Sequence, residues 1–501
     1  MSTVYGSAGR WLYTRIIIPK PTSPHLTFQT AVYFFLYLAT ICIVGGGVSG
    51  LAAAITAANA VKNKPNDFKI ILLEATSTLG GRVQSDVTED GFVLDRGFAV
   101  FIEEYPVAKQ LLDMQALQLG KFLPGALVKC KGQSKLAKVA DPFRQPEEIF
   151  NAIIAPVGSL LDKIKVLPLL YHCVNNEVED LFLEKETSTL EALDQRWKFG
   201  DDMVNTFYKP FLEGIYLAPL QEQSSRMFHF VFKMFSQGAA TLPAGGMGAV
   251  AKQLAEKAAI AGVDLRTTTP VVSIQQNDNG TFEVELEGGM KQIKATSVIL
   301  ATDGQVAQKI MSCVDGFESL ESLPENPQRA VGCLYYGFDT DVPIQEPILI
   351  LNGMGSDRGT EAFPVNNVCF PSMVSPGYAP AGKNLCSVTV LKDAMEIYKG
   401  REKDLDQAVR QQLGTWFPDH KTAILNTWDL KKIYYIPNAQ PSQFKGPFPA
   451  NVNGGRNADS YRGKPLPTGL VICGDHMATA TLNGALESGV NAGKATAKLV
   501  K

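Results

Sequence analysis

The sequence predicts an α/β fold built on a parallel sheet, and three observations support this prediction. An apolar run at residues 41–44 precedes a glycine-rich turn at residues 45–50, and an alanine-rich helical stretch follows at residues 51–58. A second apolar run at residues 69–73 ends in Glu74. A strand, a glycine turn, a helix and a second strand closed by an acidic residue form a dinucleotide-binding unit.

The glycine-rich turn supplies the backbone freedom that this unit requires. Gly45 permits the tight turn, Gly47 lets the backbone approach a pyrophosphate, and Gly50 lets helix and strand pack closely. We expect the phosphates at the helix N-terminus, beside Val48 and Ser49, where free N–H groups and the helix dipole favour an anion. A glycine-rich turn alone is also common in ordinary loops, so the flanking strands and helix carry the prediction.

Glu74 stands where an acidic side chain can bind the adenosine part of a dinucleotide. A carboxylate at that strand end accepts hydrogen bonds from both ribose hydroxyls. The alternative is a surface glutamate that merely closes a buried strand. The carboxylate would repel the 2′-phosphate of NADP, which leaves NAD and FAD as candidate cofactors.

A second cluster near the C-terminus favours FAD over NAD. The apolar run at residues 470–473 leads into Gly474 and Asp475. An alanine-rich helix is then expected to open with Asn483, Gly484 and Ala485. A C-terminus that folds back in this way holds the far end of the cofactor, and FAD is the dinucleotide that needs both ends held. An ordinary surface helix is the alternative for this tail.

The segment Leu79-Gly80-Gly81-Arg82 resembles the GGR segment of the flavin-containing amine oxidase superfamily. That superfamily includes monoamine and polyamine oxidases, protoporphyrinogen oxidase and the phytoene desaturases. The resemblance covers about residues 40–501 and is closest to the protoporphyrinogen-oxidase-like and phytoene-desaturase-like branch. This closer match rests on four sequence segments, residues 95–101, 224–235, 242–249 and 473–489.

The resemblance implies a fold and a set of cofactor contacts. The fold is a Rossmann-like FAD-binding domain of the glutathione-reductase and amine-oxidase type, with an α+β substrate domain inserted in two excursions. By resemblance, Gly81 and Arg82 lie beside the pyrophosphate and flavin, and the backbone of Val272 pairs with the adenine edge. Asp475 accepts a hydrogen bond from a ribityl hydroxyl, and the last helix points its N-terminus at flavin N1 and the C2 carbonyl.

The sequence departs from the monoamine oxidases in two respects. No Ser-Gly-Gly-Cys-Tyr-type attachment sequence surrounds any cysteine, and Tyr461 has no neighbouring aromatic partner. We therefore expect noncovalent FAD, and we place an amine substrate second.

The expected FAD-binding domain is discontinuous. It comprises residues 40–104, 240–310 and 465–501, and the substrate-binding domain comprises residues 105–239 and 311–464. Residues 1–39 are interpreted as a targeting leader, because no acidic residue precedes Asp67 and basic residues stand among many serines and threonines. A plastid is favoured over a mitochondrion. A secretory signal, a misassigned start site, and a membrane-associated or cytoplasmic protein are the alternatives.

Composition excludes several function classes. With a net charge of −3 and no long basic run, the sequence provides no basic segment of the kind that binds nucleic acid. The eight cysteines are scattered, with no CxxC and no Cys/His metal spacing, and no two of the five histidines have ligand spacing. We therefore expect no metal site.

These observations predict an FAD-dependent oxidoreductase that transfers hydride from a hydrophobic polyene or tetrapyrrole to flavin N5. A flavin amine oxidase is the runner-up. A non-catalytic prenyl or lipid carrier on the same fold is the alternative from another class. No catalytic residue is predicted: His476 is expected to pack or to touch the flavin edge, and Arg226 and His229 to form a satisfied helix face. The apolar residues 160–171 are expected to roof the substrate cavity, with peripheral membrane contact as the alternative.

Overall fold

The computed structural model describes residues 39–62, 64, 68–140, 144–145, 148, 153–289, 292–322, 328–442 and 459–499. The leader expected at residues 1–39 therefore lies outside the described residues, except for Ala39, which opens the first strand. Ala39–Lys501 form one compact unit.

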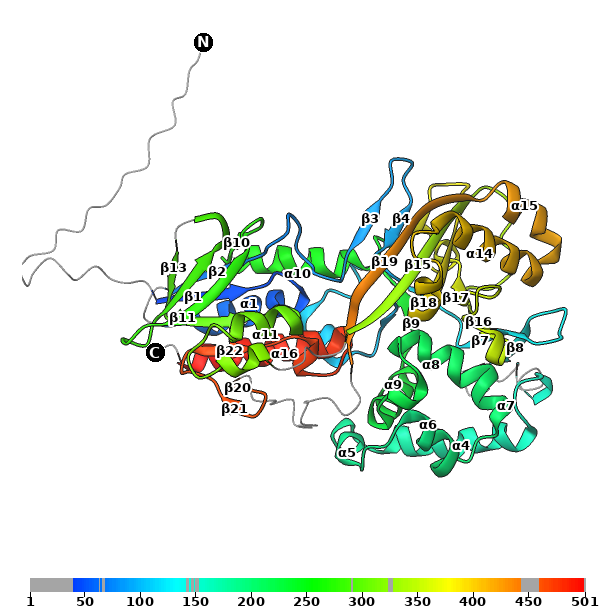
Figure 1. The fold of residues 1–501 in the computed structure, drawn as a ribbon, viewed down its shortest axis with the longest axis horizontal. Helices are drawn as coiled ribbons and strands as arrows, with labels where there is room; N and C mark the ends of the chain where they lie inside the picture. The colour runs from blue at the N-terminus through cyan, green and yellow to red at the C-terminus, as the bar shows by residue number, and fades with distance from the viewer. Residues whose placement is uncertain are drawn as a thin grey trace, which may run out of the picture. The chain divides into compact units, whose positions relative to one another are not determined.

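A five-stranded parallel sheet brings together strands from both ends and the middle of the chain (Figure 1). In spatial order its strands are β10 (Asp264–Arg266), β2 (Phe68–Leu73), β1 (Ala39–Val44), β14 (Ser297–Leu300) and β22 (Leu470–Ile472). The register places Ile41 opposite Ile70 on one side and Ser297 on the other. The last strand of the described residues, β22, therefore completes a sheet that the first, β1, begins.

The inner strands of this sheet are buried on both faces, as expected for a parallel sheet, whereas the edge strand β10 is partly exposed. Ile41 and Ile43 share a hydrophobic core with helices on one face. Those helices are α1 (Val48–Val61), α10 (Gly248–Ile260) and α16 (Leu482–Leu499). Cys42 and Val44 point to the opposite face. There they pack with α11 (Gly304–Met311) and with a small antiparallel sheet of β11 (Val271–Gln276), β12 (Phe282–Leu286) and β13 (Ile293–Ala295).

A seven-stranded sheet draws strands from both excursions of the chain. In spatial order these are β19 (Asp429–Pro441), β15 (Gln328–Phe338), β18 (Asn384–Leu391), β17 (Val365–Cys369), β16 (Leu349–Gly353), β7 (Gly125–Cys130) and β8 (Ala137–Ala140). Its apolar face packs against α13 (Lys392–Ile397), α14 (Glu402–Trp416) and α15 (Lys421–Asn426). The sheet joins β7 from the first excursion to β16 from the second in parallel register.

Short elements connect these layers. They are β3 (Ser85–Val87), β4 (Val93–Asp95), β5 (Phe101–Ile102), β6 (Gly120–Lys121), β9 (Ala240–Leu242), β20 (Ser460–Tyr461), β21 (Lys464–Pro465), α2 (Pro106–Leu111), α12 (Pro371–Val374) and the turn η10 (Asp475–Met477).

The rest of the first excursion is helical, as Figure 1 shows. Its elements are α4 (Leu160–Asn175), α5 (Val178–Leu183), α6 (Thr189–Glu191), the π-helical turn η2 (Ala192–Arg196), α7 (Asp201–Met203), a second π-helical turn η3 (Val204–Tyr208), α8 (Lys209–Tyr216) and α9 (Ser225–Gln237).

Helix α4 differs from the roofing helix that the sequence predicts. Only Asp162, Leu169 and Cys173 of its residues are buried. Leu161 and Tyr171 are 68% and 72% exposed, so the apolar face points to solvent rather than into the protein. Within the described chain, no helix is long and apolar enough to cross a membrane.

Candidate cofactor site

The glycine turn lies at the carboxyl end of β1, and its glycines serve different purposes. A Cβ on Gly50 would lie 2.0 Å from the carbonyl oxygen of Gly45, and one on Gly45 would lie 2.6 Å from that of Ala301. A Cβ on Gly47 would meet nothing nearer than the Gly81 Cα atom, at 4.0 Å. Gly45 and Gly50 are therefore required by packing, whereas Gly47 leaves space beside Gly81.

Helix α1 begins at this space with an uncapped N-terminus. Gly47 is its N-cap, and among the described residues no side chain caps it and no acidic side chain stands in its first turn. The N–H groups of Val48, Ser49 and Gly50 belong to that first turn, where intrahelical acceptors are missing. The helix end is therefore suited to an anion, and the missing Cβ of Gly47 gives that anion room.

Glu74 lies directly after β2 and is almost fully buried. Its Oε2 accepts a hydrogen bond from the Gly46 N–H at 2.8 Å. Its Oε1 accepts from the N–H of Thr76 at 2.8 Å and from the Thr76 hydroxyl at 2.7 Å. Glu74 thus ties β2 to the glycine turn, a role that the sequence did not predict. A carboxylate offers about four acceptor positions, so capacity for a ribose hydroxyl remains.

Arg82 and Asp475 form an ion pair, although the sequence separates them widely. The Nη2 atom of Arg82 lies 2.7 Å from Oδ1 of Asp475. Nη1 of Arg82 also donates to the carbonyl oxygen of Ala439 on β19, at 3.1 Å. Burial alone would raise the pKa of Asp475, but the charge and hydrogen bond of Arg82 outweigh it, so this pKa lies below its ordinary value. The pair joins the GGR segment to the end of β22.

The C-terminal cluster is held by backbone and hydroxyl contacts. The N–H of Gly474, at φ +148°, donates to the Ser488 hydroxyl at 3.1 Å. The Thr481 hydroxyl accepts from the Gly484 N–H at 3.0 Å, near the start of α16. A Cβ on Gly484 would lie 2.1 Å from the carbonyl oxygen of Thr479. Gly484 is therefore also required by packing, and Ala485 follows it, buried in the same turn.

Asn483 has a structural contact that the sequence did not indicate. Its Oδ1 accepts a hydrogen bond from the N–H of Val107, in α2, at 2.9 Å. The side chain therefore holds the start of the first excursion against the first turn of α16.

Val272 occupies an irregular position in β11. Val271 pairs with Leu286 and Ser273 with Glu285, so Val272 has no partner in the ladder with β12. Just before this strand, the N–H of Thr269 donates to the carbonyl oxygen of Glu74 at 2.8 Å. Val272, at this irregularity of the ladder, therefore follows a segment that is fixed beside Glu74.

These features suit the dinucleotide that the sequence suggested. An uncapped helix end, open space at Gly47, an acidic acceptor at Glu74 and the cationic Arg82 are brought to one edge of the parallel sheet. Ligands bind at the carboxyl ends of the strands in folds of this type. The residues present therefore fit FAD, and their individual contacts with it stay predictions.

His476 is a packing residue in this structure. Its side chain is 1% exposed, and neither ring nitrogen has a hydrogen-bond partner within the described chain. Burial is the main cause that lowers the pKa of His476, to about 4. An imidazole closed off in this way agrees with the expected packing role, and its contact with the flavin edge stays a prediction.

A polar cluster in the helical excursion was not predicted. One ligand atom from each of His172, Glu184 and His229 lies within 4.8 Å of the others. The expectation that no two histidines lie at ligand distance is wrong, because α4 and α9 bring together residues far apart in sequence. Arg196 shares this cluster, with its Nη1 atom 2.7 Å from Glu184.

Comparison with known proteins assigns the family. The flavin containing amine oxidoreductase family matches residues 48–496. The chain belongs to this family. This match confirms the expected family and the expected class, a flavin-dependent oxidoreductase. The parallel sheet covered by helices confirms the expected α/β fold.

Two porphyrinogen oxidases are similar in sequence to part of this chain. Coproporphyrinogen III oxidase of Bacillus subtilis is 27% identical over 194 residues, which are 37% of this chain and 38% of that protein. Protoporphyrinogen oxidase 2, chloroplastic/mitochondrial, of Arabidopsis thaliana is 28% identical over 176 residues, 35% of this chain and 32% of that protein. The matched segments thus span about a third of the length of these relatives.

Solved structures share the fold over nearly the whole chain. A putative protoporphyrinogen oxidase from Exiguobacterium has a TM-score of 0.64 at 18% identity, covering 92% of this chain and 99% of that one. A putrescine oxidase double mutant has a TM-score of 0.63 at 15% identity, covering 92% of this chain and 99% of that one. At these identities the likeness concerns the fold alone.

Proposed function

We propose that this flavin oxidoreductase oxidises a porphyrinogen-type tetrapyrrole. The observation that carries the proposal is the sequence similarity to porphyrinogen oxidases of both bacterial and plant origin. The amine oxidases match only as folds, at about 15% identity. A polyene substrate and an amine substrate are the second and third candidates, and a non-catalytic lipid carrier is the fourth.

The cofactor proposed for this chemistry is FAD. When bound, FAD supplies a hydride acceptor at its N5 atom. Gly47 and the first turn of α1, with Val48, Ser49 and Gly50, would hold the pyrophosphate at a positive helix end. Glu74 would orient the ribose, and the backbone of Val272 the adenine. The far end would be held by Gly81, Arg82, Gly474, Asp475, Asn483, Gly484 and Ala485.

The cysteines support noncovalent binding. Cys473 stands nearest to the proposed site in sequence, and it is fully buried directly after β22. Burial is the main cause that raises its pKa, to about 12, while a contact with the Ser49 hydroxyl opposes this. A thiol with such a pKa provides almost no thiolate for attack on a flavin. Acid precipitation should therefore release all yellow chromophore, and chromophore retained on the pellet would refute noncovalent binding.

The exposed face of α4 supports contact with a lipid surface. Its exposed apolar residues are spaced as one helical stripe: Leu160, Leu161, Ile164, Leu167, Tyr171 and Val174. We propose that this α4 stripe lies in the interface of a membrane, through which a lipid-soluble substrate would arrive. Protein that does not co-sediment with vesicles of anionic phospholipid would contradict this contact.

The location proposed is an organelle, with a plastid favoured. It is supported by the composition of residues 1–39, and by the plant relatives whose names read chloroplastic or mitochondrial. A fluorescent fusion of the first 40 or so residues that stays in the plant cytosol would contradict it.

An anaerobic substrate screen tests the proposed function. Purified yellow protein is mixed separately with coproporphyrinogen III, protoporphyrinogen IX, a carotene precursor and putrescine, and loss of the flavin absorbance in the blue is followed. We expect only the porphyrinogens to bleach the flavin. Bleaching by putrescine alone would establish the amine oxidase, and bleaching by the polyene alone the desaturase. Protein that purifies colourless and does not take up FAD would support the carrier.

A further inference from the structure

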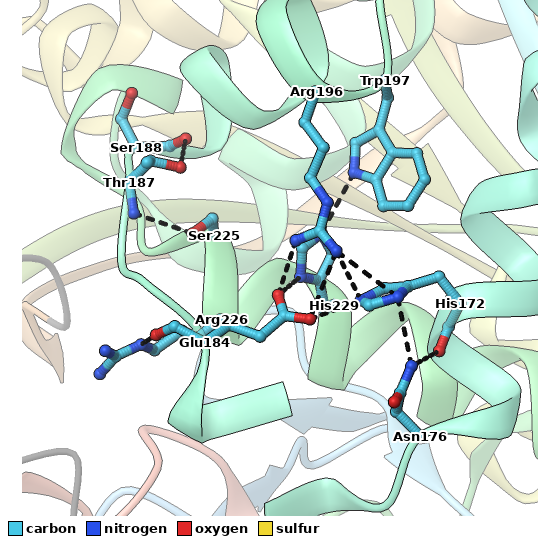
Figure 2. Close-up of polar contacts among 10 residues, drawn as sticks. All are labelled: His172, Asn176, Glu184, Thr187, Ser188, Arg196, Trp197, Ser225, Arg226 and His229. Carbon is cyan, nitrogen blue, oxygen red and sulfur yellow. Dashed lines mark hydrogen bonds and ion pairs between the residues drawn. The ribbon is translucent and has the colours of Figure 1, made fainter. Parts of the chain in front are cut away.

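The polar cluster in the helical excursion joins four separate elements (Figure 2). His172 lies near the end of α4, and Glu184 directly follows α5. Arg196 ends the π-helical turn η2, with Trp197 next to it, and His229 lies in the middle of α9. A π-helical turn is rare and frequently marks a functional position.

Glu184 is the centre of this cluster. Its Oε1 lies 2.7 Å from Nε2 of His172, and its Oε2 lies 3.2 Å from Nδ1 of His229. Oε2 also lies 2.7 Å from Nη1 of Arg196. Burial alone would raise the pKa of Glu184, but hydrogen bonds from His229 and Arg196 lower it to about 2. The carboxylate is therefore charged at neutral pH.

The outer nitrogens of both imidazoles face N–H donors. The indole N–H of Trp197 donates to Nε2 of His229 at 3.1 Å. The Nδ2 atom of Asn176 lies 3.2 Å from Nδ1 of His172 and also donates to the His172 carbonyl oxygen at 2.8 Å. The indole can only donate, so Nε2 of His229 accepts and the proton of the neutral ring lies on Nδ1, the nitrogen nearer Glu184.

This proton arrangement opposes a metal ion. A histidine ligand presents a lone pair to the metal, whereas the His229 nitrogen nearer the carboxylate, Nδ1, carries the proton of the neutral ring. Arg196 also supplies the positive charge that a metal ion would bring, and its Nη2 atom lies 3.0 Å from Nε2 of His172. The negative charge of Glu184 is therefore already neutralised by a side chain of the protein, Arg196.

The doubly protonated rings each leave one N–H without an acceptor. On His229 this N–H would face the indole N–H of Trp197, and on His172 the Nδ1–H would face the amide nitrogen of Asn176. The charged groups facing the two rings are Glu184, Arg196 and the other imidazole. Burial is the largest cause that lowers the pKa of His172 and of His229, and the charge of Arg196 adds to it, while Glu184 opposes both.

Helix α4 depends on polar contacts because it buries so little. Pro168 interrupts its backbone hydrogen bonds near the middle. In the N-terminal half, Asp162 accepts from the N–H groups of Ser159 and Gly200 at 3.0 and 2.9 Å. These hydrogen bonds, together with one from Lys165, outweigh the effect of burial and hold the pKa of Asp162 far below its ordinary value. Acidification to about pH 5 therefore leaves this half intact.

The C-terminal half of α4 is held by His172 and by Lys233, whose Nζ donates to the carbonyl oxygens of Val174 and Asn176 at 2.9 and 3.0 Å. A cavity of about 520 Å³ is lined by Glu184, Arg196 and His229, which gives water a path to the cluster. The N-terminal half is therefore anchored by a carboxylate, and the C-terminal half by Lys233 together with an imidazole, the side chain whose charge changes near neutral pH.

We propose that His172, Glu184, Arg196 and His229 form an acid-sensitive latch that holds the C-terminal half of α4 against α9 and η2. Because the folded protein resists the second proton, the stabilising contribution is complete above the unfolded imidazole pKa of about 6.5 and is lost as the pH falls below it. Opening frees the end of α4 that carries Tyr171 and Val174.

Hydrogen exchange read by mass spectrometry tests the latch in the full-length protein. Protection factors, corrected for the intrinsic rate, are compared between residues 160–167 and residues 169–175 from about pH 7.5 to about pH 5.5. We expect protection of residues 169–175 to fall about tenfold per pH unit for each histidine that titrates, with residues 160–167 unchanged. The variant H172Q/H229Q should show no such pH dependence, and the control H420Q, altered outside the cluster, should behave as wild type.

Three results would overturn the latch. Equal loss of protection in both halves would show global acid unfolding instead. Protection of residues 169–175 that stays constant with pH in the wild type would show that no imidazole titrates there. Protection raised by Zn²⁺ at about pH 7.5, and abolished in H172Q/H229Q, would show a metal site. None of these outcomes depends on bound flavin or on the substrate.

Discussion

Helices α1 and α4 are of similar length but are held in opposite ways. In α1, 11 of the 14 residues are buried, and no side chain among the described residues caps its N-terminus. In α4, 3 of the 16 residues are buried, and Ser159 and Asp162 form a complete capping box. Helix α1 is fixed by packing, and helix α4 by the polar groups at its two ends.

The packing of α1 depends on the absence of side chains. A Cβ on Gly489 of α16 would lie 2.1 Å from the carbonyl oxygen of Ser49, and one on Gly493 would lie 2.6 Å from that of Ala53. Backbones at such close approach fix the helix N-terminus firmly, which suits a phosphate-binding end. Helix α4 buries only three of its residues against the described part of the chain, so its surface stays open to change. The comparison indicates a rigidly packed α1 and a loosely held α4.

The largest expected effect is that of Gly50→Ala, which breaks the packing of α1. The new methyl carbon would lie 2.0 Å from the Gly45 carbonyl oxygen, a backbone atom that cannot move aside cheaply. We expect a loss of about 3 kcal/mol or more in the free energy of unfolding, together with loss of bound flavin. Urea unfolding followed by circular dichroism measures it. An unchanged midpoint would mean that α1 tolerates displacement.

Gly47→Ala is the matched variant at the same turn. Its methyl group would meet no protein atom nearer than 4.0 Å, and Gly47 has φ −68°, which alanine adopts readily. We expect an unchanged unfolding midpoint but FAD bound about thirtyfold more weakly, about 2 kcal/mol, because the methyl group enters the space proposed for the pyrophosphate. Titration of the apoprotein with FAD measures the affinity. Wild-type affinity would place the pyrophosphate elsewhere.

Ala485→Asp tests whether the N-terminus of α16, the helix that packs on α1, faces the flavin ring. An acidic side chain in the first turn of α16 would oppose the negative charge of a reduced flavin at that helix end. Such effects amount to about 0.3 to 2 kcal/mol, so the potential should fall by roughly 10 to 40 mV. A dye-coupled reductive titration measures the shift. With FAD still bound, an unaltered potential would contradict the assignment of α16 to the flavin ring.

The smallest effect is expected from Leu161→Ser on α4. Leu161 is 68% exposed, so its replacement removes little packing, and the unfolding midpoint should change by no more than about 0.5 kcal/mol. Sedimentation with anionic vesicles should nevertheless decrease if the α4 stripe touches lipid. A large loss of stability would instead show that α4 is packed against a surface, as the sequence had suggested.

The cofactor side was predictable because its signals are local. The strand at residues 41–44, the turn with Gly45 and Gly50, and the closing Glu74 all follow from short-range spacing, and β1, α1 and β2 confirm the order of elements. The sequence predicted that the apolar face of α4 roofs a cavity, whereas the structure leaves that face exposed. An apolar helical stripe has the same pattern whether a protein core or another apolar surface covers it.

The sequence by itself determined the flavin oxidoreductase family and the α/β fold, and it supplied the residues proposed for the cofactor site. Only the tertiary structure decided that Arg82 pairs with Asp475, that Asn483 binds the backbone of Val107, and that His172 and His229 share Glu184. The physical reason is distance along the chain. Backbone geometry and hydrophobic periodicity act over a few residues, whereas ion pairs and shared protons form between whichever side chains packing brings together.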